Sequence, residues 1–370
     1  MWKRFLVIYF SVVLILTGCA TSKIVDDVML VRIITYDLIE DNKLLMKISV
    51  PIFKNPQSTD VELFEAKTGM SKIGKKLMNF EAPSPVVGGQ VAVALYGEAL
   101  ARRGIYDLVD TLHRDASIGN RIKLAVTKGS ATELLSKSLD SVGQRPGMYI
   151  ENLILQNEKK ESLPETNLHL FMKYYYSVGR DPYLPIIDKE SGHAKITGIA
   201  LFKKDKLVKE VLLKDLFILR MLIGEKYKSG SFEVSLEDKE EQSIEYEESV
   251  VLIENIRSKT KTKVTIKSNE PTIKLNVQLL GTVTELKDGG NLKNAQTIRK
   301  IERLAERRIE QRAHSLINEL KESHVDPAGF GNHVKNHWRE WDEKKWEEIY
   351  PKLKVDVQAN VKIVSSGIIE

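Results

Sequence analysis

A nearly unbroken hydrophobic stretch opens the chain. Residues 5–16 are almost all apolar, and they follow the basic residues Lys3 and Arg4. The stretch is shorter than the roughly 20 apolar residues that a permanent transmembrane helix needs. A basic start, a short apolar run and small residues at its end are typical of an export signal. We therefore expect residues 1–18 to be a signal peptide.

Strand-like and helix-like patterns alternate in the next part of the chain. The first two β-branched runs flank the polar residues 40–42 and predict a β-hairpin, which a loop at 53–62 follows. Ile73, Leu77 and Phe80 recur at helical spacing. The predicted strands are 28–36, 44–51, 91–96 and 122–126, and the predicted helices lie within 64–80, 97–104, 106–112 and 131–139. This alternation favours a mixed α/β domain over residues 19–190.

The pattern is weaker toward the end of this part. Residues 151–165 show no clear period, and residues 168–176 fit either a strand or a short helix. Pro182 and Pro185 then fix the backbone and remove two hydrogen-bond donors. We therefore predict a linker or an inter-domain loop at 181–185.

The last part of the chain has the clearest pattern. Its predicted strands are 195–202, 207–213, 232–236, 249–257, 263–266, 272–280 and 355–363, and its predicted helices are 216–223, 294–322 and 334–349. Apolar and polar residues alternate along 272–280, which is typical of a sheet with one covered face. The long helix carries one continuous apolar stripe. We predict an α+β, multi-domain protein, in which an N-terminal mixed α/β domain precedes an antiparallel sheet covered by a long helix (195–370).

The single cysteine of the chain indicates which type of signal peptide residues 1–18 form. Cys19 follows Leu16-Thr17-Gly18, and an apolar residue, two small residues and a cysteine form a bacterial lipobox. We predict that Cys19 is lipidated and that cleavage occurs just before it. The alternative is an ordinary signal peptide, or an uncleaved anchor helix, with an incidental cysteine. Two acyl chains on one residue are enough for stable membrane anchoring, and no disulfide within the chain is then expected.

Charge and composition narrow the classes of function. Removal of residues 1–18 takes away Lys3 and Arg4 and no acidic residue, which lowers the formal net charge from +5 to +3. This small excess does not favour nucleic acid as a partner. The apolar fraction of 42% is sufficient for proper cores.

The sequence offers few candidate catalytic or metal-binding residues. His333 and His337 have the i, i+4 spacing of zinc ligands, but neither the metalloprotease glutamate nor a free cysteine accompanies them, so we interpret them as surface residues. Glu98 follows a predicted strand, and a charge at a helix N-terminus explains it. We find no phosphate-binding loop, nucleophile elbow or paired-carboxylate motif, and we expect no catalytic residue, cofactor or metal.

Several aromatic residues gather near the C-terminus. Trp338, Trp341, Trp346 and Tyr350 fall on the last predicted helix. An exposed row of such rings holds a sugar or a partner helix in some proteins. We favour packing against the neighbouring sheet, which needs a cover.

Taken together, several motifs resemble one family, the Ger(x)C lipoproteins, which are the C subunits of germinant receptors in endospore-forming bacteria. They extend in order from Cys19 to the C-terminus. No single motif is specific for the family, but their order and spacing are. The matching residues are the lipobox at Cys19, Gly97-Glu98-Ala99-Leu100-Ala101-Arg102-Arg103-Gly104-Ile105, Arg114, Asp181-Pro182-Tyr183-Leu184-Pro185, Gly198-Ile199-Ala200-Leu201-Phe202-Lys203 with Asp205-Lys206, and Asp326 with Gly329-Phe330-Gly331.

The resemblance implies a non-enzymatic subunit with several mixed α/β domains. It would be held by its lipid on the outer face of the spore inner membrane, where it would assemble with the A and B membrane subunits of the receptor to sense nutrients. The alternatives are an exported, lipid-anchored hydrolase or envelope-glycan binder and, less well supported by the unlike halves, a solute-binding lipoprotein. A receptor subunit predicts exposed apolar patches, whereas a hydrolase or glycan binder predicts a cleft with convergent carboxylates or exposed tryptophans.

Overall fold

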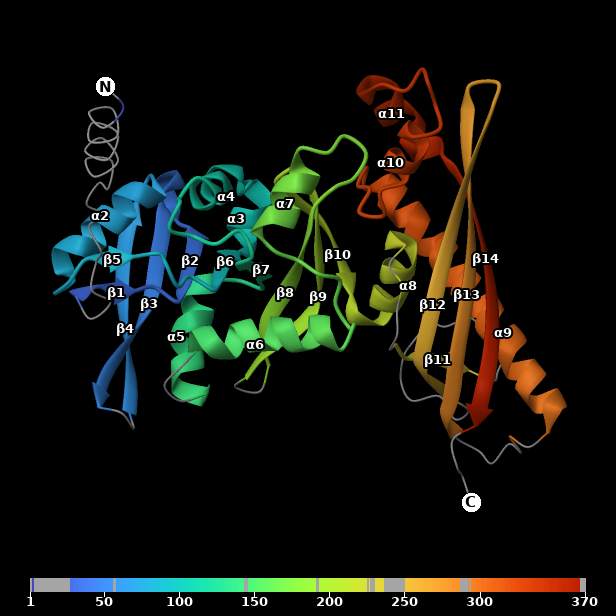
Figure 1. Cartoon of the computed structure of the whole chain (residues 1–370), viewed down its shortest axis with the longest axis horizontal. Coiled ribbons are helices and arrows are strands. Elements are labelled where there is room, and N and C mark those ends of the chain that lie inside the picture. Colours follow the sequence, from blue (N-terminus) through green and yellow to red (C-terminus); the bar gives the residue numbers. More distant parts are fainter. Residues whose placement is uncertain are drawn as a thin grey trace.

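A computed structural model shows a mixed α/β protein, whose described residues form three β-sheets (Figure 1). It describes Trp2 and residues 27–366, except for 56–57, 143–145, 191–192, 225, 227–229, 236–249, 287–291 and 293. The predicted signal peptide and lipidation site, Cys19, lie outside the described residues. Within the described ranges, no helix combines the length and apolar character needed to cross a membrane.

The largest sheet has eight strands, in the order β10-β9-β8-β7-β6-β2-β3-β4. Its strands are β2 (Ile33–Leu38), β3 (Leu44–Asn55), β4 (Ser58–Thr68), β6 (Val93–Gly97), β7 (Lys123–Thr127), β8 (Tyr183–Glu190), β9 (His193–Lys203) and β10 (Lys206–Leu212). The central strands β2, β6, β7 and β8 are parallel, and antiparallel strands complete both sides. A two-stranded parallel sheet of β1 (Met29–Leu30) and β5 (Val86–Val87) lies beside it.

Helices cover both faces of this sheet, and each face has its own apolar core. The helices are α2 (Ser71–Glu81), α3 (Glu98–Arg103), α4 (Tyr106–His113), α5 (Ala131–Val142), α6 (Pro146–Lys159), α7 (Leu168–Tyr175) and α8 (Leu213–Ile223). Neighbouring strand residues point to opposite faces, so that Ile34 packs with residues of α3, α4 and α7, while Ile33 packs with residues of α5 and α6. Figure 1 shows these two groups of helices on opposite sides of the sheet.

The third sheet forms the C-terminal part, in the order β11-β12-β13-β14. Its elements are β11 (Phe232–Ser235), β12 (Val250–Lys267), β13 (Glu270–Leu286), α9 (Ala295–Glu322), α10 (Phe330–Lys335), α11 (Glu343–Ile349), the 3-10 turn η3 (Tyr350–Lys352) and β14 (Lys354–Ser366). The apolar stripe of α9 is buried from Ile301 to Leu320. The α+β, multi-domain class is confirmed. β14 departs from the expected antiparallel order, because α9 returns the chain so that β14 runs parallel to β13.

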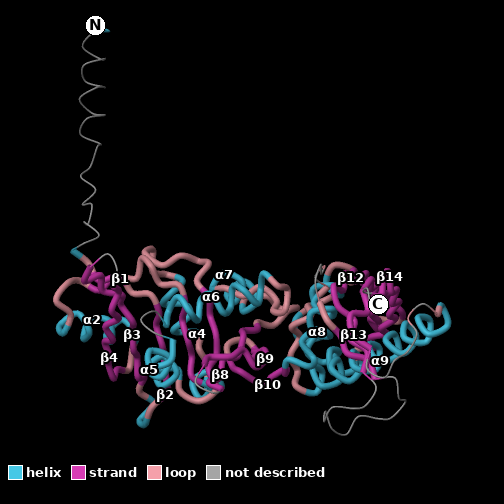
Figure 2. Tube along the Cα trace, turned by 90° about the horizontal axis from the view of Figure 1, so that it is seen from below, coloured by secondary structure: helices cyan, strands magenta, loops and turns pink. Residues whose placement is uncertain are grey.

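Helix α8 connects the two large sheets. It contacts β9 and β10 on one side and β12 and α9 on the other. All its residues from Ile218 to Ile223 are buried, and one continuous apolar core includes residues of both sheets. Figures 1 and 2 both show α8 between the sheets.

Many sequence predictions are confirmed, including the hairpin of β2 and β3. The strands predicted at 195–202 and 207–213 correspond to β9 and β10, and the helices predicted at 216–223 and 294–322 correspond to α8 and α9. The predicted loop at 53–62 is wrong, since β3 and β4 pair up to Asn55 and Ser58. β4 is an edge strand, where polar side chains are tolerated. The helix predicted within 64–80 begins only at Ser71, because Phe64 belongs to β4.

Four further parts of the sequence analysis need correction. Residues 146–159 form α6, which begins with Pro146 at a position that proline favours. The predicted linker at 181–185 is wrong in part, since Pro185 lies within β8 just before that strand's pairing with β7 begins. Residues 249–257 and 263–266 belong to one long strand, β12. The helix predicted at 334–349 is two short helices, the second capped by Asp342.

The predicted domain division at 190–195 falls between β8 and β9, which pair within one sheet. It stays a prediction.

Candidate functional site

Two motif residues far apart in the sequence, Asp181 and Asp326, form a buried junction. Asp181 precedes β8, and Asp326 lies in the loop between α9 and α10. The N–H of Asp326 donates to Asp181 Oδ2 at 2.7 Å, and the N–H of Asp181 donates to the carbonyl of Asp326 at 2.8 Å. Asp326 also accepts the N–H groups of Phe330 at 3.0 Å and Gly331 at 2.8 Å. The junction therefore fixes the start of α10 to the start of β8 in the eight-stranded sheet.

Burial dominates the electrostatics of this junction. Asp326 is 2% exposed and Asp181 is 7% exposed. The pKa of Asp326 is raised to about 7, mainly by the loss of hydration; the nearby Asp181 acts in the same direction, and the backbone N–H groups oppose it. Burial also raises the pKa of Asp181, although Lys203, with Nζ 3.5 Å from Oδ2, acts in the opposite direction.

Glycines allow the two backbones at this junction to approach closely. A Cβ on Gly179 would lie 2.4 Å from the backbone nitrogen of Asn332, and a Cβ on Gly331 would lie 2.6 Å from Gly179 Cα. Gly329 has a φ of 74°, a left-handed conformation that suits glycine. The Gly329-Phe330-Gly331 motif thus has a physical reason in the packing of this junction.

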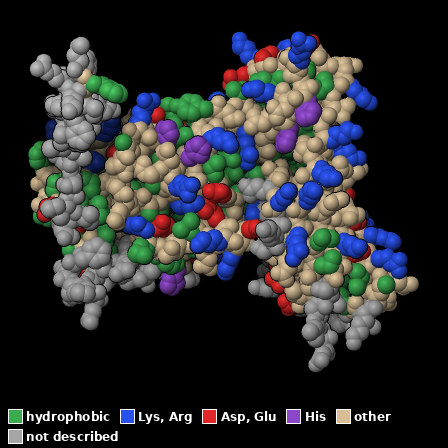
Figure 3. Space-filling view, viewed as in Figure 1, with side chains coloured by type: hydrophobic (Ala, Val, Ile, Leu, Met, Phe, Trp, Pro, Cys, Tyr) green, Lys and Arg blue, Asp and Glu red, His purple; other side chains and the backbone are tan. Residues whose placement is uncertain are grey.

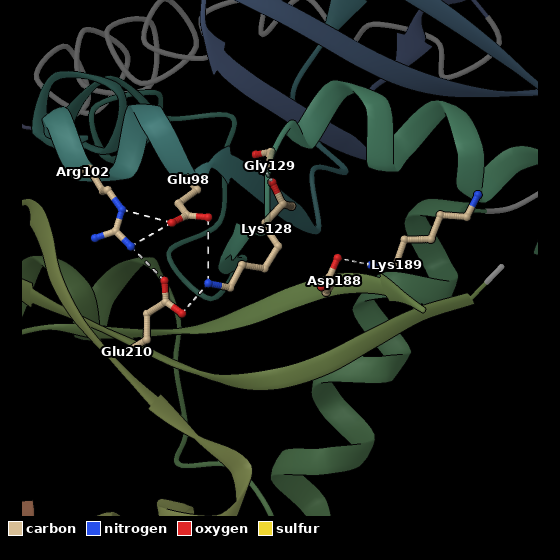
Figure 4. A network of polar contacts seen from close by, with 8 residues as sticks. Glu98, Arg102, Lys128, Gly129, Asp188, Lys189 and Glu210 are labelled. Carbon is tan, nitrogen blue, oxygen red and sulfur yellow. Dashed lines mark hydrogen bonds and ion pairs between the residues drawn. The ribbon is translucent and has the colours of Figure 1, made fainter. Parts of the chain in front are cut away.

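A second group of motif residues joins α3 to β10 (Figure 4). Arg102 donates two hydrogen bonds to Glu98 Oε1, at 2.8 and 3.0 Å, and a third to Glu210 Oε1 at 3.0 Å. Lys128 pairs with Glu210 and lies 3.9 Å from Glu98. The hydrogen bonds from Arg102 are the main reason why the pKa of Glu98 is lowered. Glu98 is the first residue of α3, as the sequence predicts, and it is paired with basic residues. Figure 3 shows acidic and basic side chains gathered in the middle of this face.

Gly104, Ile105 and Asp205 hold the same region together through contacts with the backbone. Gly104 has a φ of 132°, and a Cβ there would meet Asp205 Oδ2 at 2.6 Å. The carbonyl of Asp205 accepts the Ile105 N–H, and its carboxylate accepts the Tyr106 N–H at 3.2 Å. The Gly104-Ile105 and Asp205-Lys206 motifs are therefore two halves of one contact.

The sequence analysis missed Asp37, which is buried at the end of β2. Its carboxylate accepts the N–H groups of Ala131 and Thr132, both at 2.8 Å, and the hydroxyl of Ser130 at 2.7 Å. A Cβ on Gly97 would lie 2.1 Å from Asp37 Oδ1. Asp37 thus reinforces the Ser130 cap of α5 from another strand. A lone acidic residue in a β-branched run was the only sequence signal.

His337 is exposed, as the sequence analysis expects, whereas His333 is half-buried and two of the tryptophans pack in the core. His337 Nδ1 lies 2.9 Å from the carbonyl oxygen of His333, and burial lowers the pKa of His333, which is half-buried. Within the described ranges, no group of three or more His, Cys, Asp or Glu side chains is arranged to hold a metal ion. Trp338 and Trp346 are buried in the core, which confirms the packing interpretation for these two rings.

Comparisons with known proteins agree with the motifs. A family model described as "Spore germination protein N-terminal domain" matches residues 21–189, and one described as "Spore germination B3/ GerAC like, C-terminal" matches residues 197–367. Spore germination protein GerQC of Bacillus cereus is 32% identical over 371 residues, which cover 100% of this chain and 99% of the relative. Putative spore germination protein YfkR of Bacillus subtilis (strain 168) is 24% identical over 291 residues, 74% of this chain and 71% of the relative.

A solved structure also matches. The crystal structure of the GerBC protein aligns with a TM-score of 0.59 at 18% identity, covering 90% of this chain and 96% of that one. At this identity the likeness concerns the fold. In this chain Asp181, Asp326 and Asp205 lie at junctions between distant segments of the fold, and their polar groups hold these segments together.

Proposed function

Because the chain belongs to the Ger(x)C family of germinant receptor C subunits, we propose that it is a lipid-anchored, non-enzymatic subunit of a nutrient-sensing spore germination receptor. The observation that carries the proposal is the relationship to GerQC, which extends over the full length of both chains. A relationship of this extent includes the first residues of the chain, where the lipobox ends at Cys19.

The proposed subunit works by contact with other proteins. The buried carboxylates Asp37, Asp181 and Asp326 all accept backbone N–H groups, and Glu98 and Glu210 are paired with basic residues. Hydrogen bonds and ion pairs of this kind stabilise the fold, and they engage these carboxylates in structural contacts. This supports a scaffold whose surfaces bind the A and B membrane subunits. The diacylated Cys19 holds it on the outer face of the spore inner membrane.

The test is a co-purification from detergent-solubilised spore inner membrane. The wild type is compared with Cys19→Ala and with Ser22→Ala, which changes a nearby residue that carries no lipid. We expect the wild type and Ser22→Ala to retain two larger membrane subunits and normal nutrient germination. Cys19→Ala is expected to leave the membrane fraction and to impair germination. A wild-type protein that is membrane-bound but alone, in spores that germinate normally without it, would contradict the proposal.

A further inference from the structure

Helix α2 presents its large apolar side chains to the outside. Met70, the N-cap residue in an extended conformation, precedes the helix, and Ile73, Leu77 and Phe80 follow within it at intervals of four and three residues, which places these three on one face. The exposed fractions of the four side chains are 62%, 48%, 42% and 78%. Scattered apolar residues on a protein surface are ordinary, but a contiguous face of this kind marks an interaction site.

The opposite face of α2 explains this orientation. Its buried residues are Ser71, Gly74 and Met78, which are mostly small. A Cβ on Gly74 would lie 3.0 Å from Met46 Sδ and 3.1 Å from Thr68 Cγ2. The helix therefore packs closely on β3 and β4 through its small residues, and its bulky residues remain available for something outside the chain.

Basic residues accompany the apolar face. Lys72 and Lys76 are exposed, while Lys75 is half-buried and lies 3.9 Å from Asp115. Glu81 is the only acidic residue of the helix. A helix with an apolar face beside lysines matches the interface of a bilayer that contains anionic lipids, where the apolar side chains enter the acyl boundary and the lysines meet the headgroups.

The predicted lipid anchor is within reach of this helix. The ten residue steps from Cys19 to Met29 span at most about 36 Å. The N–H of Met29 donates to the carbonyl of Pro85 at 2.9 Å, and the next residue, Val86, donates its N–H to Asn79 Oδ1 on α2 at 2.8 Å. Figure 1 shows α2, β1 and β5 at the same end of the molecule, and Figure 2 shows α2 and β1 together at that end. Cys19 is thus at most about 36 Å from the strand that borders β5 and α2.

We propose that α2 is a membrane-docking helix, whose face of Ile73, Leu77 and Phe80, with Met70 before it, enters an anionic bilayer beside the acylated Cys19. This inference rests on the proposed lipid anchor. A tether alone leaves the body of the protein free to rotate above the membrane. The α2 contact would hold one end of the eight-stranded sheet against the bilayer and so fix which surfaces face the other receptor subunits.

The experiment places an environment-sensitive fluorophore on the full, lipidated protein through Leu77→Cys. Leu280→Cys is the matched control, because Leu280 is the same residue type, is 41% exposed and lies on β13 of the C-terminal sheet. Each protein is reconstituted in vesicles of phosphatidylcholine, with and without phosphatidylglycerol. The readouts are the emission maximum and quenching by aqueous iodide, and the mass of the Cys19 peptide reports the anchor.

We expect the label at 77 to shift to the blue and to become several-fold less accessible to iodide in phosphatidylglycerol vesicles, with no change at 280. Equal quenching at both positions in an acylated protein would overturn the docking helix and leave the anchor standing. An unmodified Cys19 with a shielded label at 77 would overturn the anchor alone. Shielding only after the membrane subunits are added would show that the face binds protein, and would also overturn the proposal.

Discussion

Asp326 links the stability of the protein to pH. Its pKa is raised from 3.8 to about 7 by burial, so between these values the folded state keeps a proton that the unfolded state gives up. The free energy of unfolding should therefore rise as the pH falls from 7 toward 4, by at most about 4 kcal/mol at 1.4 kcal/mol per pKa unit. Asp326→Asn removes this group, and the difference between wild type and variant in urea denaturation should follow the predicted slope.

Other carboxylates contribute to the pH dependence of both proteins, and the difference between them removes these shared contributions. The control is Asp41→Asn. The Asp41 side chain is 81% exposed, and its left-handed backbone also suits asparagine. Its stability curve should run parallel to that of the wild type. If the Asp326→Asn curve also runs parallel to the wild type, the carboxyl is ionised throughout and the proposed origin of its pKa is wrong.

At the scale of elements, helix α9 protects the edge of the C-terminal sheet. Glu302, Glu306 and Glu310 lie one turn apart, and each accepts a backbone N–H of β14, from Ile363, Val361 and Ala359 at 2.8 to 3.0 Å. Edge strands with free N–H groups attract other strands. The three carboxylates occupy these donors and so make β14 a poor template for aggregation.

We predict that Glu306→Ala accelerates amide hydrogen exchange at Val361, because this N–H loses its acceptor. The cost in stability should be about 1 kcal/mol, the usual net value of a hydrogen bond. Glu306→Gln keeps a carbonyl oxygen as acceptor and should exchange nearly as slowly as the wild type. Exchange that is unchanged in the alanine variant would show that another group protects this amide.

Helices α9 and α2 also show what apolar periodicity can predict about a helix and what it cannot. The stripe of α9 was predicted correctly because a long helix with one apolar face has a single favourable way to cover a sheet. The spacing of Ile73, Leu77 and Phe80 indicated a helix correctly, but the core lies on its other face, where Gly74 and Ser71 allow close packing. Periodicity identifies an apolar face and cannot say whether this chain or another molecule covers it.

From the sequence, the residues of the candidate site could be recognised only as separate motifs. The order of the motifs indicated the family, but spacing along the chain does not reveal that Asp181 meets Asp326 or that Gly104 meets Asp205. These contacts depend on how β8 and β10 join the large sheet and on how α9 returns the chain. Asp37 gave almost no signal, because a cap supplied by a distant strand leaves no local pattern around α5.

At the scale of the whole molecule, α8 makes the two large sheets one cooperative unit. Leu219 is fully buried in the core that residues of both sheets share. Three of the four tryptophans lie between 338 and 346 in the C-terminal part, so their fluorescence reports on that part, whereas far-UV circular dichroism reports on all elements. In the wild type the two signals should give one unfolding midpoint, as expected for a coupled molecule.

Leu219→Ala should cost about 2–5 kcal/mol, as other buried leucine truncations do, and should separate the two midpoints, since it weakens the connection between the parts. Leu124→Ala is the control, because Leu124 is equally buried but belongs to the other core, on the opposite face of the large sheet. It should lower both midpoints together. Midpoints that stay coincident in Leu219→Ala would place the coupling in the Asp181–Asp326 junction, which joins the same two parts on another side and would then be sufficient alone.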